Sequence, residues 1–279
     1  RSEIEPGCKK IPIFQPIVIC FCMKVTHFLA LMFAAALLLC LPACKSGGKS
    51  QKSNVARELP AELAAAYRED AARLAVRELN STAQTGELDA TIPQERIDYF
   101  FGLFTKIYWM CKDVDSIPDL SGIHTLKNPN LRQIMVVLEK DSPFKENWSK
   151  GITLTNNLYL NQLITKNKIT IKNYRETTLG PSLTMETAGF VNTKELAFLV
   201  KNFESIRHAE AEGKVGDGND ITFGSDSKNG LAIKYSIGEG DCPSGCINRK
   251  TWVFYILPDG SINYMGTRGK IPATSEPPK

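Results

Sequence analysis

Residues 251–257, which read TWVFYIL, constrain the fold more than any other part of the chain. Alternate side chains of a strand point to opposite faces, and here the residues on both faces are apolar. Such a strand is expected at the centre of a sheet that is covered on both sides. The sequence Pro-Asp-Gly at 258–260 then predicts a tight turn, with residues 261–265 pairing back as a hairpin.

Two amphipathic helices are expected earlier in the chain. The first begins near Pro60, and Glu69 and Arg73 should form an i,i+4 ion pair on its exposed side. The second follows Thr91, which would cap it. Its apolar face is rich in aromatic residues and includes Cys111, which is therefore interpreted as a buried thiol.

Helices followed by antiparallel hairpins predict an α+β fold. We expect N-terminal helices packed on one face of a mainly antiparallel sheet, with β-hairpins towards the C-terminus. One α+β domain over residues 56–270 is the preferred organisation, although a split near Gly180-Pro181 would give two smaller domains. Residues 271–279, which include three prolines, should form a loose tail.

Residues 23–43, followed by Cys44, have the parts of an export signal. Lys24 is basic, an apolar core follows, and the segment ends in Leu-Pro-Ala-Cys. This ending resembles the bacterial lipobox, which implies cleavage before Cys44 and acylation of its thiol. Two alternatives stay open: cleaved secretion without a lipid, and a retained helix, because the apolar run approaches the length that spans a bilayer.

The segments beside this signal are interpreted from it. Residues 1–22 precede the first methionine and are expected to be a leader that the natural protein lacks. Residues 44–55 are rich in Ser, Gly and Lys and should form a flexible tether. The protein is thus expected to be lipid-anchored in the bacterial cell envelope. The residue after Cys44 is not aspartate, which favours the outer membrane by resemblance to the known sorting signal.

From Cys44 onward, 30 Lys and Arg residues stand against 28 Asp and Glu residues, a formal charge of +2. So balanced a chain argues against a nucleic-acid partner, which normally requires a clustered basic surface. No catalytic or cofactor-binding motif is recognised, so no cofactor is expected. We therefore expect a non-catalytic domain that binds an envelope protein or a glycan, besides the membrane that its lipid would enter.

Cys242 and Cys246 lie in a turn-rich segment, and an exported protein can form disulfides. A local bridge between them is expected. Residues 238–250, which we call the contact loop, combine this bridge with the densest cluster of turn residues and charge in the chain. Because rigid loops often carry recognition, we expect Asp241, Ser244 and Arg249 to contact a partner. Residues 217–220 resemble a fragment of a calcium loop but are interpreted as a turn entering a strand.

A metal-dependent envelope hydrolase is the alternative function. If residues 205–212 form a strand, His208, Glu210 and Glu212 point to one face, and an imidazole with two carboxylates suits a divalent metal. We predict instead an edge strand whose charged side chains face water, with no metal. His124 is a second candidate base, although a structural role is the preferred interpretation.

Three blocks of sequence carry a resemblance to known proteins: residues 67–75 (YREDAARLA), 123–125 (IHT) and 240–246 (GDCPSGC), the last followed by Trp252. With them the chain resembles a family of exported bacterial proteins of unknown function. The resemblance covers most of the chain after Cys44, and the cysteine block is its most distinctive part. No activity is assigned to such proteins, so the resemblance implies export and no functional residue.

Overall fold

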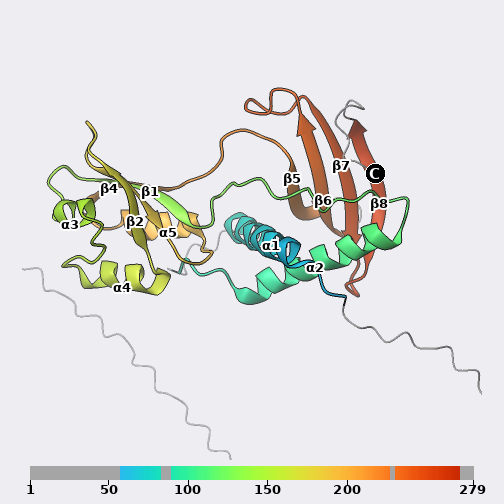
Figure 1. The fold of residues 1–279 in the computed structure, drawn as a ribbon, viewed down its shortest axis with the longest axis horizontal. Helices are drawn as coiled ribbons and strands as arrows, with labels where there is room; N and C mark the ends of the chain where they lie inside the picture. The colour runs from blue at the N-terminus through green and yellow to red at the C-terminus, as the bar shows by residue number, and fades with distance from the viewer. Residues whose placement is uncertain (1–56, 83–88, 227–229, 271–279) are drawn as a thin grey trace, which may run out of the picture. The chain divides into compact units, whose positions relative to one another are not determined.

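The computed structural model describes residues 57–82, 89–226 and 230–270 (Figure 1). These residues belong to one compact unit, Val55–Lys279. The predicted signal, Cys44, the tether and the C-terminal tail lie outside the described residues. Within the described ranges, no helix combines the length and the apolar character needed to cross a bilayer.

The described elements confirm the α+β class. The helices are α1 (Ala61–Thr82), α2 (Gln94–Asp113), α3 (Lys145–Ser149), α4 (Leu158–Asn167) and α5 (Thr193–Lys201). The strands are β1 (Gln133–Leu138), β2 (Thr170–Arg175), β3 (Ser182–Glu186), β4 (Ile206–Ala211), β5 (Asp220–Asp226), β6 (Gly230–Glu239), β7 (Asn248–Ile256) and β8 (Ile262–Lys270). The strands form two antiparallel sheets, in the orders β2-β3-β1-β4 and β5-β6-β7-β8. The sequence did not indicate this division into two sheets.

Strand β7 occupies the central position that its apolar pattern predicted, between β6 and β8. One of its faces contributes Trp252 and Phe254 to the main hydrophobic core, whereas Val253 and Tyr255 pack with Ala232 in a smaller cluster on the other face. The predicted hairpin is also present, since the Leu257 amide donates to the Ser261 carbonyl across the turn into β8. The prediction of an inner strand with both faces buried is therefore confirmed for β7.

Helices α1 and α2 cover one face of the β5–β8 sheet (Figure 1), and their apolar side chains pack with those of the sheet in the main hydrophobic core. Aromatic rings join the layers: Phe100 of α2 lies edge-on to Phe223 of β5, with ring centroids 4.9 Å apart. Phe104 reaches Tyr235 of β6 at 6.3 Å and Tyr67 of α1 at 5.4 Å. Edge-to-face contacts of this kind add to the apolar area that the rings bury, so the aromatic face of α2 is a packing surface.

The other sheet has its own hydrophobic core. Helix α5 packs against β1 and β4, and its first turn is capped by the Asn192 side chain, which accepts from the Glu195 amide. Trp148 of α3 and Leu160 of α4 are fully buried in this core. Each sheet is thus stabilised by its own set of helices, which explains how one chain supports two separate sheets.

Two expectations about the first helices are wrong in detail. Arg73 does pair with Glu69, at 2.8 Å, but its side chain is only 3% exposed, because a loop distant in sequence covers it. Thr91 does not cap α2: its amide and hydroxyl both donate to Asp89, and Pro93 is the N-cap residue without a side-chain bond. Burial of Arg73 thus has a distant cause, whereas Thr91 is diverted by a neighbouring carboxylate.

We expect Tyr235→Phe to raise the free energy of unfolding by about 1 kcal/mol, because the buried Tyr235 hydroxyl has no hydrogen-bond partner among the described groups. Tyr255→Phe on the neighbouring strand is the matched control, since its hydroxyl accepts from Arg268. That control should lower the free energy by about 1 kcal/mol. Denaturant unfolding of both variants measures the difference, and an equal loss in both would show that Tyr235 is hydrogen-bonded.

Candidate functional site

The contact loop joins β6 to β7 and contains the expected disulfide between Cys242 and Cys246. Inside the bridge the Ser244 amide donates to the Asp241 carbonyl, and just outside it the Ile247 amide donates to the Gly240 carbonyl at 2.9 Å. These bonds make a compact turn. The loop backbone is therefore held by both covalent and hydrogen bonds.

Asp217, just before β5, fastens the loop to the rest of the domain. Its amide donates to the Cys242 carbonyl at 2.6 Å, and its carboxylate accepts from the Cys246 amide at 3.3 Å. The same carboxylate forms an ion pair with Arg249 and accepts from the Gly218 amide. The hydrogen bond from Arg249 is the main reason that the pKa of Asp217 lies below its usual range. Through its backbone and its side chain together, Asp217 thus bonds to both cysteines and to Arg249 of the strand that follows them.

Two glycines make this close packing possible. A Cβ atom at Gly216 would lie 2.9 Å from the Cα atom of Pro243, which is shorter than real Cβ contacts. A Cβ atom at Gly238 would collide with the sulfur of Cys246. These positions therefore require glycine because another part of the chain approaches the backbone closely. The glycines were the sequence signal that could have pointed to the docked loop.

The predicted contact residues have different environments. Asp241 and Ser244 are exposed, and Asp241 has a positive φ of 43°. Arg249 is instead held inward, because it pairs with Asp217 and donates to the Ser236 hydroxyl at 2.7 Å. Arg249 thus supports the loop, while Asp241 and Ser244 remain open to a partner.

Two highly exposed apolar residues, Ile247 in the contact loop and Val215 beside it, were not predicted from the sequence. Val215 is 90% exposed and Ile247 is 76% exposed. Val215 precedes the segment that packs on Cys242 and Pro243, and Ile247 follows the bridge directly. Apolar side chains on a fixed backbone, bordered by polar ones, are typical of protein contact surfaces.

Of the metal candidates, His208 and Glu210 lie on β4, an edge strand as expected, and Glu212 directly follows it. His208 and Glu210 are half exposed and adjacent, with 3.4 Å between Nε2 and Oε2. Glu212 is drawn away, since its carboxylate accepts from the Thr184 hydroxyl. Across the described part of the chain, no three His, Cys, Asp or Glu side chains gather closely enough to hold a metal ion.

A buried polar cluster on α1 is the main feature that sequence reasoning missed. Asp70 accepts from the amide and hydroxyl of Thr125 and lies 2.8 Å from Nδ1 of His124. Arg73 donates to the Thr125 hydroxyl and to the Pro129 carbonyl. The sequence blocks 67–75 and 123–125 therefore meet here.

The cluster explains why His124 is more basic than an ordinary histidine. Its hydrogen bond to Asp70 raises the pKa of the imidazole above its ordinary value, because a carboxylate favours the protonated ring. The His124 side chain is 43% exposed. Cys111 is buried as expected, and burial raises the pKa of its thiol to about 11, which makes it a poor nucleophile.

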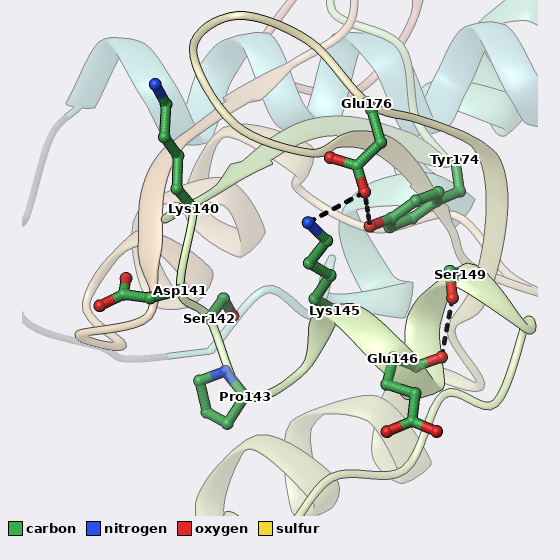
Figure 2. Close-up of a pocket in the computed structure, with 9 residues that line it drawn as sticks. All are labelled: Lys140, Asp141, Ser142, Pro143, Lys145, Glu146, Ser149, Tyr174 and Glu176. Atoms are coloured by element: carbon green, nitrogen blue, oxygen red, sulfur yellow. Dashed lines mark hydrogen bonds and ion pairs between the residues drawn. The ribbon is translucent and has the colours of Figure 1, made fainter.

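Two cavities lie elsewhere. One, of about 540 Å³, is polar; Figure 2 shows Lys145 and Tyr174 converging on the Glu176 carboxylate in its wall. Burial, and then the bond to Glu176, raise the pKa of Tyr174 to about 12. The other, of about 630 Å³, is mostly apolar. It lies between α2 and the end of the sheet where β6 begins and β7 ends, with Leu231 and Leu257 in its wall. Neither cavity contains the predicted site residues.

The domain is therefore an α+β structure with two antiparallel sheets and a disulfide-closed loop fastened by Asp217. No protein family, curated protein or solved structure matches the chain.

We expect Asp217→Ala to loosen the contact loop while the domain stays folded. Amide hydrogen exchange at residues 244–247 should become faster, whereas the free energy of unfolding should fall by less than about 1 kcal/mol, because the ion pair is partly exposed. Asp259→Ala, which removes a turn carboxylate that accepts from Ser261, is the matched control. Unchanged exchange in the loop would contradict the role of Asp217.

The raised pKa of His124 predicts a pH-dependent stability. The folded-state pKa lies above that of the unfolded chain, so the stabilisation is complete below about pH 6.5 and is lost as the pH rises through the folded value. NMR titration should show the imidazole pKa falling towards its ordinary value in Asp70→Asn. The same pKa in both proteins would show that Asp70 is not the cause.

Proposed function

We propose that this chain is a lipid-anchored protein of the bacterial cell envelope. Its α+β domain is non-catalytic and binds a partner through the contact loop. The anchor rests on the lipobox-like segment that ends at Cys44. The binding role is carried by one observation: Asp217 fixes both ends of the loop while apolar and polar side chains beside it stay exposed.

The chemistry of the exposed residues favours a protein partner over a glycan. Val215 and Ile247 are aliphatic, and aliphatic side chains gain most by burial against another apolar surface. Because the backbone beneath them is already fixed, little conformational entropy is lost on binding. The exposed Asp241 and Ser244 can then supply polar contacts at the edge.

The anchor predicts a paired result in bacteria that express the full chain. The chain should be recovered in the membrane fraction with an acylated N-terminal Cys44, as read by intact mass. Cys44→Ser should abolish the acylation. Cys40→Ser, which changes a cysteine inside the apolar core of the signal, should preserve it and is the control. Acylation that persists in Cys44→Ser would contradict the lipobox.

Contact through the loop predicts site-specific crosslinking in intact cells. A photoreactive residue in place of Ile247 should give a discrete adduct that disappears when Asp217→Ala is added, because the loop is then no longer fixed. The control position is Met265 of β8, which is also exposed but lies outside the loop. Equal adducts from both positions would show adhesion without specificity and contradict the proposed contact surface.

A second function, hydrolysis with His124 as general base, is favoured by the Asp70–His124 pair. The buried Asp70 carboxylate occupies Nδ1, so Nε2 of the half-exposed ring is the nitrogen left for proton transfer in acid–base catalysis. The raised pKa of the ring weakens this function, because more of the imidazole is then protonated at neutral pH. Hydrolysis of envelope glycan or peptide by the full chain, abolished in His124→Gln, would establish it in place of the binding role.

A further inference from the structure

Residues 152–159 run from the loop after α3 into the first turn of α4, and their large apolar side chains are exposed instead of buried. Their large apolar members all face solvent, with Leu158 67% and Tyr159 75% exposed. Ile152 and Leu154 are more than half exposed as well. Among the intervening residues, Thr153, Thr155 and Asn157 are partly buried and Asn156 is exposed. Four exposed large apolar side chains within eight residues indicate an interaction surface rather than scattered surface residues.

Polar side chains hold the backbone of this segment in place. The Asn161 side chain bonds both the amide and the carbonyl of Thr155, each at 2.7 Å. The buried Trp148 indole donates to the Thr153 carbonyl at 2.9 Å. Asn157 accepts from the Leu160 amide and so caps α4. Because the polar groups are used internally, the apolar side chains are presented outward on a fixed scaffold.

The charge of the surrounding region indicates what the segment meets. Residues 145–172 contain five lysines and one glutamate, a formal charge of +4. Glu176 and Asp89, which pair with two of these lysines, reduce the local charge to +2. Three of the lysines also contact surface carboxylates, as Lys150 does with Glu146 and Lys166 with Asp89. Exposed pairs of this kind contribute little, so these lysines can turn to other anions.

We infer that residues 152–159 form a membrane-facing surface, which inserts its leucines, isoleucine and tyrosine into the interface of an anionic lipid bilayer while the neighbouring lysines contact the headgroups. Aliphatic side chains with a tyrosine beside lysines suit the boundary between headgroups and acyl chains. The surface is distinct from the contact loop, which lies between β6 and β7. It does not require an acyl chain on Cys44, although such an anchor would keep the surface close to the bilayer.

The test compares two tryptophan positions in the full chain mixed with lipid vesicles. In Tyr159→Trp, acyl chains carrying bromine should quench the added fluorescence in vesicles that contain phosphatidylglycerol, and much less in vesicles of phosphatidylcholine alone. Val215→Trp is the matched control, because Val215 is even more exposed but lies beside the contact loop. It should remain unquenched in both vesicles.

A second set of variants tests the apolar side chains and the charge separately in the Tyr159→Trp chain. Leu158→Ser should weaken the local partitioning by roughly tenfold. Phe198→Ser, an exposed apolar residue of α5, should have no effect and is its control. Lys168→Glu should reduce quenching in the anionic vesicles only. All three positions are exposed, so the fold should survive and circular dichroism checks it.

Two results would overturn the inference. Tryptophan at 159 that stays unquenched on anionic vesicles would exclude insertion, and a discrete crosslink from that position to another protein in cells would then assign the surface to a protein partner. Equal quenching at 159 and 215 would indicate adsorption without orientation. Because both readings come from the domain itself, they are independent of whether Cys44 is acylated.

Discussion

A line of polar side chains on α1 is the constraint on which the rest of the structure depends. Asp70, Arg73 and Arg77 follow one another at spacings of three and four, so they lie on one side of the helix. All three bond to the segment 124–130 that leads into β1, and Arg77 also pairs with Asp220 at the start of β5. One helix therefore ties the start of both sheets. Loss of one partner would leave a charge sheltered without compensation, which typically costs about 3–5 kcal/mol.

Features with local causes could be predicted from the sequence. The two-faced apolar pattern of β7 and the turn that follows it each depend on neighbours in the chain, and both are present. The same holds for the cap at Asn192 and for the Cys242–Cys246 bridge, whose cysteines are four residues apart. The α+β class followed, because it depends only on which segments are helical and which are extended.

Features with distant causes could not be predicted. Arg73 looks like an exposed helix residue until the segment containing Thr125 folds over it. Arg249 looks like a free cation beside a loop until Asp217 approaches it from before β5. The separation of the strands into two sheets depends likewise on which helices cover which strands. In all three cases the environment of a residue or strand is determined by a contact far away in the sequence, and the periodicity of side chains carries no information about such contacts.

The contact loop and residues 152–159 are stabilised in the same way, although they belong to different parts of the fold. The contact loop joins two strands of the β5–β8 sheet, whereas residues 152–159 lead into α4, which packs in the core of the other sheet. In each, polar groups satisfy the backbone from within, through Asp217 in one and Asn161 in the other. In each, apolar side chains are left exposed outside. Folding supplies the ordering of these segments in advance, so burial of the apolar side chains against a partner or a bilayer is opposed by less entropy. A surface prepared in this way needs only a modest apolar area to bind, because less of the gain from burial is lost to ordering.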